Sequence, residues 1–261
     1  MLFLLSPAKT LDLQSKIPAA VARRATAPEH GEAAAALIDN LRRLSVPDVA
    51  ALMDLSNDLA TLNVDRYHQW QPQHDTTTSR PAVLTFAGDV YDGLDARSLN
   101  LSSLDWAQRH LAILSGLYGC LRPLDLIQAH RLEMGTTLQN PAGCDLYSYW
   151  GDRVSQSLQA RAQQEGHKWV INLASQEYAR AALRPSLGLP VIHIRFEEGR
   201  AGRFSVISFF AKRARGLMAR WAIEHRVRKP TALQAFDSEG YAFAPEASGN
   251  ETWVYRRTIP T

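Results

Sequence analysis

Basic residues gather in one segment near the carboxyl end of the chain. Apolar positions at helical spacing predict a long helix over residues 211–228, stopped by Pro230. Up to that proline the segment has one acidic residue, Glu224, and seven basic ones: Lys212, Arg213, Arg215, Arg220, Arg226, Arg228 and Lys229. Planar guanidinium groups hold phosphate oxygens through paired hydrogen bonds, so this helix favours phosphate binding.

The predicted helix separates its apolar and basic side chains. At about 100° per residue, the apolar side consists of Ala214, Leu217, Met218 and Trp221. The opposite arc consists of Lys212, Arg213, Arg215, Arg220 and Arg226, with Gly216 and Ala219 in its middle. Small residues there would let a phosphate backbone approach between the cations. The alternative is the solvated outer face of an ordinary surface helix.

A second candidate phosphate site lies in residues 111–125. A predicted helix enters a turn that contains Gly116 and Gly119, and Pro123 can open a second helix. This is similar to a helix-hairpin-helix, in which backbone N–H groups hold a DNA phosphate without reading a base. The usual motif separates its glycines by one residue, whereas two residues separate them here. Gly116, Gly119 and Arg122 join the candidate DNA-binding residues, and a purely structural corner is the alternative.

Polar residues beside predicted strand ends and turns form a third set: Lys9, Asp12, Asp89, Arg122, Asp125, Arg131 and Glu133. If they converge, they make a mixed-charge cleft. Carboxylates could then act as general acid and base, and Lys9 as a phosphate ligand or nucleophile. The candidate catalytic residues are Lys9, Asp12, Asp125 and Glu133. The alternative is a set of separate surface ion pairs and helix caps.

Other chemical motifs are missing from the sequence. It contains no GxxxxGK[ST], GxGxxG or HExxH pattern, and its eight histidines are dispersed. We therefore expect no metal and no cofactor, and we favour a non-enzymatic protein. Two cysteines, Cys120 and Cys144, form no CxxC pair and are expected to be buried thiols.

The composition is that of a folded, soluble protein. Of 261 residues, 46 % are apolar and 21 % charged, and the net charge is +3. This balance excludes a globally basic nucleic-acid coat protein, although it permits a local basic patch. The apolar start of the chain is short and lacks a basic leader, so we expect no signal peptide. We expect no membrane contact and a cytoplasmic location.

Apolar runs and turn residues outline a mixed α/β fold. Strands are predicted over residues 2–5, 82–86, 169–173, 190–194 and 204–210. Two or three helices are predicted over residues 29–62, one of them starting after Ser45, and another over residues 105–114. No Pro/Gly/Ser-rich linker divides the chain, so we expect one domain over residues 1–261.

Several motifs in this order resemble the bacterial YaaA family of peroxide-stress resistance proteins. They are LSPAKTLD at 5–12, GDVY at 88–91, LSGLYG at 114–119, LRPLD at 121–125, RLEMG at 131–135, NLAS at 172–175 and AKRARGLM at 211–218. The resemblance covers nearly the whole chain. It implies a mixed α/β fold particular to the family, with a helix-hairpin-helix-like element and a positively charged cleft.

The same resemblance implies binding to double-stranded or distorted DNA. It also implies protection of DNA and proteins from hydrogen peroxide, linked to lower free intracellular iron. We therefore expect a monomeric, largely sequence-independent binder of the DNA phosphate backbone. The main alternative is an enzyme that acts on a nucleotide, nucleobase or DNA lesion in the mixed-charge cleft, and a third is direct iron sequestration.

Overall fold

An eight-stranded sheet runs through the part of the chain that the computed structural model describes, residues 1–200 and 202–258. Its order is β11-β12-β9-β8-β1-β5-β6, with β10 beside β9. The strands are β1 (Leu2–Leu5), β5 (Leu111–Ser115), β6 (Gly119–Leu121), β8 (Val170–Asn172), β9 (Val191–Arg200), β10 (Arg203–Ser205), β11 (Ala242–Phe243) and β12 (Thr252–Thr258). The smaller pairs are β2 (Thr10–Leu11) with β4 (Phe86–Ala87), and β3 (Arg80–Pro81) with β7 (Leu126–Ile127).

Strand β1 is the centre of the parallel part of this sheet. It pairs in parallel with β5 on one side, Leu5 opposite Ile113, and with β8 on the other, Leu4 opposite Asn172. All four of its residues are buried, which is typical of a parallel strand covered on both faces. The carboxyl ends of β1, β5 and β8 therefore meet at one edge of the sheet.

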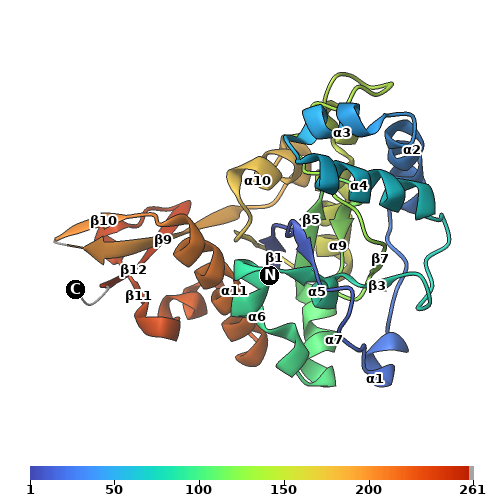
Figure 1. The fold of residues 1–261 in the computed structure, drawn as a ribbon. Helices are drawn as coiled ribbons and strands as arrows, with labels where there is room; N and C mark the ends of the chain where they lie inside the picture. Colours follow the sequence, from blue (N-terminus) through green and yellow to red (C-terminus); the bar gives the residue numbers. More distant parts are fainter. Residues whose placement is uncertain (201, 259–261) are drawn as a thin grey trace.

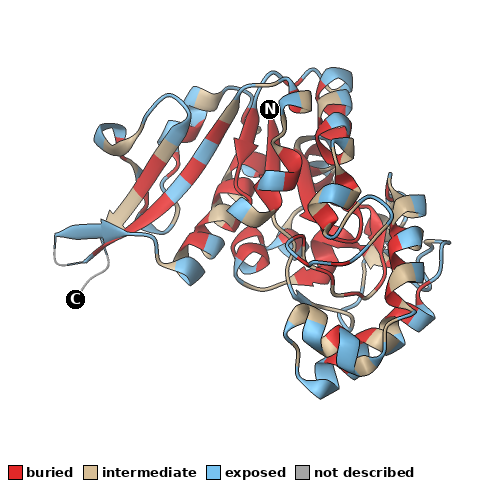
Figure 2. Cartoon of the chain, turned by 90° about the horizontal axis from the view of Figure 1, so that it is seen from above, coloured by how far each residue is buried: buried red, intermediate tan, exposed pale blue. Residues whose placement is uncertain are grey.

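Helices surround the sheet, and the mixed α/β class predicted from the sequence is confirmed (Figure 1). The longer helices are α2 (Gly31–Leu41), α3 (Val46–Met53), α4 (Asn57–Gln69), α7 (Leu101–His110), α9 (Arg153–Gln164) and α11 (Ser208–Glu224). The shorter ones are α1 (Ala19–Ala22), α5 (Ala82–Thr85), α6 (Asp89–Leu94), α8 (Leu146–Trp150) and α10 (Gln176–Ala182). Helices α2, α3 and α4 gather at one end of the molecule, and β9, β10 and β12 project at the other (Figure 1). Figure 2 shows the strands around β1 as the buried centre.

The start of α3 follows the sequence signal. The Ser45 side chain accepts a hydrogen bond from the Asp48 backbone N–H, and the Asp48 carboxylate accepts one from the Ser45 backbone N–H. This reciprocal pair satisfies two N–H groups that have no partner within the helix. Pro47 lies in the first turn, where its missing N–H has no cost.

Three elements predicted from the sequence differ in the structure. Residues 82–85 form helix α5 instead of a strand, and the predicted strand over 204–210 ends at Ser205 before α11 begins. The helix predicted over 105–114 ends at His110, and strand β5 begins at the next residue. Residues 82–85 are a short, fully buried apolar run, whose periodicity cannot separate a strand from a helical turn. At the other two sites one element follows another with few or no residues between them, and apolar composition does not mark such a boundary.

The expected helix-hairpin-helix is also wrong. Its first half is strand β5 and its second half is β6, which pairs antiparallel with β5. Both glycines are buried: a Cβ on Gly116 would lie 2.3 Å from the Leu132 carbonyl oxygen, and one on Gly119 2.8 Å from the Trp150 ring. Gly119 also has a φ of +67°. Neither glycine leaves room for a phosphate. Both instead permit a tight turn between strands and close packing.

Helix α11 packs against α6 through two glycines. A Cβ on Gly216 would lie 1.8 Å from the Val90 carbonyl oxygen, and one on Gly93 would lie 2.2 Å from the Arg213 carbonyl oxygen. Both contacts involve backbone atoms, so the two helices can approach this closely only without side chains. Gly216 and Ala219 are therefore covered by protein, and the idea that they open the basic arc to a phosphate is wrong.

We expect Gly216→Ala to destabilise the fold by about 1–3 kcal/mol or more, because the added methyl group overpacks a backbone contact. Without that clash, alanine in a helix interior is more stable than glycine by about 1 kcal/mol. Gly31→Ala is the matched control, since nothing lies within 4 Å of a Cβ at that helical position. Urea unfolding curves measure both variants. Equal stability of the two would contradict the close contact between α6 and α11.

Candidate functional site

A pocket of about 380 Å³ lies at the carboxyl edge of the parallel strands. Ser6 follows β1, Ser115 ends β5, and Ser175 follows β8; all three line this cavity, called the main pocket below. From β1 the sheet extends to β5 on one side and to β8 on the other, so the strand order reverses there. Ligands of open α/β sheets bind at such a point.

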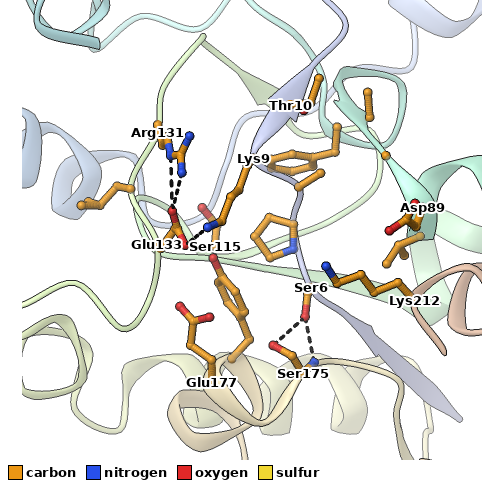
Figure 3. A pocket seen from close by; sticks show the side chains of 18 of the residues that line it. Ser6, Lys9, Thr10, Asp89, Ser115, Arg131, Glu133, Ser175, Glu177 and Lys212 are labelled. Carbon is orange, nitrogen blue, oxygen red and sulfur yellow. Dashed lines mark hydrogen bonds and ion pairs between the residues drawn. The ribbon is translucent and has the colours of Figure 1, made fainter. Parts of the chain in front are cut away.

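Hydrogen bonds tie the loops of the main pocket together. The Ser175 backbone N–H donates to the Ser6 hydroxyl over 2.8 Å, and the two hydroxyls lie 3.3 Å apart (Figure 3). The Tyr91 hydroxyl, from helix α6, donates to the Ser6 carbonyl oxygen. These bonds fix the chain that continues from Ser6 to Lys9, because each binds the loop after β1 to a neighbouring element.

Two cations converge on Glu133 at the mouth of the main pocket. The Lys9 ammonium lies 2.8 Å from one carboxylate oxygen, and the Arg131 guanidinium lies 3.1 Å from the other (Figure 3). The Lys9 side chain is 63 % exposed and that of Glu133 is 25 % exposed. An exposed ion pair adds little stability, about 0–1 kcal/mol. The cluster is therefore free to exchange a partner for a ligand at small cost.

Helix α11 contributes two further cations to the opposite wall. Lys212 is exposed, whereas Arg215 is half-buried, and burial lowers the pKa of its guanidinium. The Arg215 Nε atom is buried and has no hydrogen-bond partner among the described residues. A buried N–H without a partner is costly, so this group is suited to a ligand that accepts a hydrogen bond.

The main pocket has a mixed charge. Its four cations are Lys9, Arg131, Lys212 and Arg215, and its three carboxylates are Asp89, Glu133 and Glu177. One carboxylate oxygen of Glu177 already accepts the Gly135 backbone N–H over 2.8 Å. The lining is therefore formally +1, which suits a ligand that has both anionic and hydrogen-bonding groups.

A neutral histidine completes the inner wall. His130 is 6 % exposed and packs edge-on against Tyr118, with ring centroids 5.2 Å apart. Its Nδ1 donates to the Gln128 carbonyl oxygen over 2.8 Å. Burial lowers the pKa of His130 to about 4, so the ring is neutral at pH 7.

The basic residues of α11 do not form one surface. Arg213 pairs with Glu239 at 2.6 Å. Arg220 pairs with Asp95 and with Glu224, and it also donates to the Leu94 carbonyl oxygen. These two guanidinium groups hold α11 to its neighbours, whereas Lys212 and Arg215 face the main pocket.

The predicted polar set divides into three places. Lys9, Asp89, Arg131 and Glu133 meet in the main pocket. Asp12 instead accepts hydrogen bonds from the backbone of Gln14 and Ser15 and pairs with Arg97 at 2.7 Å. A single cleft that contains the whole set is therefore wrong, because the residues after Lys9 turn away along β2.

Arg122 and Asp125 lie in a separate cavity of about 260 Å³ beside β6. The Asp125 carboxylate accepts the Thr26 hydroxyl at 2.6 Å and the Arg122 backbone N–H at 2.7 Å. Burial raises the pKa of this carboxyl group. Because β6 runs antiparallel to β5, its carboxyl end lies at the amino edge of the parallel strands, away from the main pocket.

Sequence reasoning missed several pocket residues: Ser6, Ser115, Ser175, Glu177 and Tyr178. A usable signal existed for the serines. Each ends or follows a buried strand, and the carboxyl ends of parallel strands meet at one edge. Glu177 and Tyr178 gave no such signal, because they reach the pocket through the packing of α10.

The described part of the chain has neither a cluster of metal ligands nor a helix suited to a bilayer. Among residues 1–200 and 202–258, no three histidine, cysteine or carboxylate side chains gather in a way that could hold a metal ion. None of the described helices combines the length and apolar character needed to cross a bilayer.

The two cysteines are free thiols, and Cys144 is exposed, which corrects the expectation that both are buried.

Comparison with known proteins gives consistent matches along the chain. The family described as "Peroxide stress protein YaaA" matches residues 1–247. A protein of Leptothrix cholodnii, named UPF0246 protein, is 57 % identical over 257 residues, which is 98 % of each chain. A UPF0246 protein of Albidiferax ferrireducens is 52 % identical over 260 residues, covering 100 % of this chain and 99 % of its own.

The neutral His130 predicts a pH dependence of stability. Its pKa is about 4 in the folded chain, below the ordinary 6.5, so the unfolded chain binds more protons between these values. Stability therefore falls as the pH drops from 6.5 towards 4. Between pH 7 and pH 5, we expect the free energy of unfolding to fall by about 2 kcal/mol less in His130→Gln than in wild type.

Urea unfolding at both pH values measures this difference. The control is His68→Gln, because that side chain is exposed in the folded chain. A His130→Gln variant with the wild-type pH dependence would show that burial does not lower the pKa of His130.

Proposed function

Because the chain belongs to the peroxide stress protein YaaA family, we propose that it binds DNA during the response to hydrogen peroxide. The main pocket takes one nucleotide of a distorted or unpaired strand. The observation that carries this proposal is the convergence of four cations, from separate segments of the chain, on one cavity at the point where the strand order reverses. The expected cellular outcome is protection of DNA and proteins, with lower free iron.

The size of the main pocket favours one nucleotide over a duplex. Its 380 Å³ lies in the usual range of small-molecule pockets. Enzymes that do chemistry on a single base of DNA take it out of the stack and hold it in such a pocket. This cost is smallest for a mismatched, damaged or unpaired base, which fits a protein that meets oxidised DNA.

The lining offers separate partners for the two halves of a nucleotide. Lys212 and Arg215 on α11 supply one cationic donor each for the phosphates on either side of that nucleotide. Across the cavity, Lys9 and Glu133 supply a donor and an acceptor for the edge of a base. Arg213 and Arg220 are paired with carboxylates. They therefore add less to phosphate binding than unpaired arginines would.

Removing the two pocket cations of α11 tests this assignment. We expect Lys212→Ala/Arg215→Ala to weaken binding of a single-stranded oligonucleotide. The slope of log K against log salt should become flatter by about 1.4, since each phosphate contact on a single strand contributes about 0.7. Fluorescence anisotropy across a salt series measures both. The control is Arg213→Gln, on the same helix but paired with Glu239.

The exposed Lys212→Ala single variant keeps the test valid if loss of Arg215 disturbs folding; its slope should fall by about 0.7. Salt-insensitive binding, or an equal loss in Arg213→Gln, would count against the pocket as the phosphate site. Free iron after peroxide treatment, measured in cells complemented with each variant, tests the cellular part of the proposal.

The Lys9–Glu133 pair favours a second candidate, an enzyme that acts on a nucleotide, nucleobase or DNA lesion. An ammonium and a carboxylate 2.8 Å apart in a ligand-sized pocket can move a proton to or from a bound base. A positioned acid or base typically accelerates a reaction by about 10²–10⁴-fold.

Glu133→Gln keeps the shape of the side chain and removes its charge. If the second candidate holds, wild type converts mononucleotides or an oligonucleotide carrying an oxidised guanine, and the variant does so at least about 100-fold more slowly. Chromatography of the products measures turnover. A wild-type rate no higher than that of the variant would leave DNA binding without chemistry.

A further inference from the structure

An exposed apolar patch lies where the projecting strands meet helix α11. Phe204 is 42 % exposed, Val206 is 46 % exposed and Phe209 is 55 % exposed. These three lie within six consecutive residues, whereas the other large exposed apolar side chains in the described chain are Leu59, Leu62 and Trp169. We call residues 203–209 the apolar patch. Figure 1 places it on β10 and the start of α11, beside the projecting end of β9.

One ring face in the patch is already occupied by a cation. The Arg256 guanidinium lies 4.3 Å from the centre of the Phe204 ring. Phe209 packs against Phe210 with ring centroids 4.0 Å apart. The Phe204 ring also lies against Gly199, where an added Cβ would be 2.7 Å from the ring. Both rings are therefore held in place by neighbours, as a stacking platform requires, and part of each stays exposed to solvent.

The segment that contains the patch has charges of one sign. The acids nearest to it belong to other elements and are already paired: Glu198 lies opposite Ser205 and binds Arg257, and Glu246 binds the Arg256 that covers Phe204. Residues 199–223 contain six basic residues and no acidic residue. Three of the six, Arg200, Arg203 and Lys212, are exposed and form no ion pair with any residue that the structure describes. The unpaired cations thus lie on both sides of the apolar side chains in the sequence.

The patch continues into the main pocket. Phe209 and Lys212 are three residues apart on α11, so they are neighbours on one face of the helix. Lys212 also lines the main pocket. A chain molecule bound there can therefore extend over Phe209 towards Phe204.

Two occupants fit an exposed apolar patch, a second copy of the chain and a single-stranded nucleic acid, and the charge distinguishes them. In a two-fold dimer the same patch of each copy meets the other. Here that would bring the unpaired cations Arg200, Arg203 and Lys212 of the two copies together, because residues 199–223 contain no acid and the neighbouring carboxylates Glu198 and Glu246 are already paired with arginines. A single-stranded nucleic acid supplies the opposite charge on its phosphates, and its bases stack on aromatic rings without regard to sequence.

We propose that the apolar patch, through Phe204 and Phe209, stacks the bases of a single strand whose neighbouring nucleotide enters the main pocket. This inference rests on the proposed function. It adds the identity of the bound state, an unpaired strand, and a contact surface outside the pocket. Arg200 and Arg203 lie beside the phosphates of the stacked segment.

The test compares two probes on one variant. Phe204→Leu/Phe209→Leu keeps the apolar character and removes the aromatic faces. The probes are fluorescent dT15 and an oligomer of the same length whose abasic residues retain the phosphates without bases. We expect about tenfold weaker binding of dT15, the lower range of one stacking contact, and less than a twofold change for the abasic oligomer. Leu59→Ala/Leu62→Ala, on exposed apolar residues of α4, should bind both probes as wild type does.

Each outcome has a separate meaning. Unchanged dT15 binding by the phenylalanine variant, or an equal loss on both probes, overturns the stacking patch while leaving the pocket proposal intact. Wild-type protein that binds neither probe overturns the proposed function and this inference together. A concentration-dependent dimer in sedimentation, lost in the phenylalanine variant, would assign the patch to a second copy of the chain.

Discussion

The parallel pairing of β1 with strands on both sides is the constraint on which the rest of the structure depends. Backbone hydrogen bonds to β5 and β8 place three carboxyl strand ends at one edge. The chain must leave the sheet at each of these ends, and its loops cannot fill the edge completely. This pairing places Ser6, Ser115 and Ser175 around one cavity.

The contact between α6 and α11 then gives that cavity its second wall. Gly93 and Gly216 let two helix backbones touch, and this close approach brings Lys212 and Arg215 to the pocket. Helix α11 would lie farther from α6 if either glycine had a side chain. Helix packing therefore sets the distance between the cations of α11 and the Lys9–Glu133 pair.

Tertiary contacts divide the basic residues of α11 into different roles. Carboxylates from other elements neutralise Arg213 and Arg220, whereas Lys212 remains unpaired among the described residues and the Arg215 Nε atom has no hydrogen-bond partner. The formal charge of the α11 segment is thus much larger than the charge that a ligand in the main pocket meets. A mixed-charge pocket with a small net positive charge is suited to discriminating a nucleotide by its hydrogen bonds as well as by its phosphate.

The sequence by itself determined the fold class, the buried strand 2–5, the capped helix after Ser45 and the family, because apolar periodicity, capping residues and ordered motifs are local signals. It did not determine where Gly116, Gly119 and Gly216 lie, since a glycine suits a turn, a phosphate site and a close backbone contact equally well. It also gave one set of polar residues, which tertiary structure divided among the main pocket, the cavity beside β6 and the Asp12–Arg97 pair. Only strand order decides which chain segments meet at an edge, and strand order depends on contacts between residues far apart in the sequence.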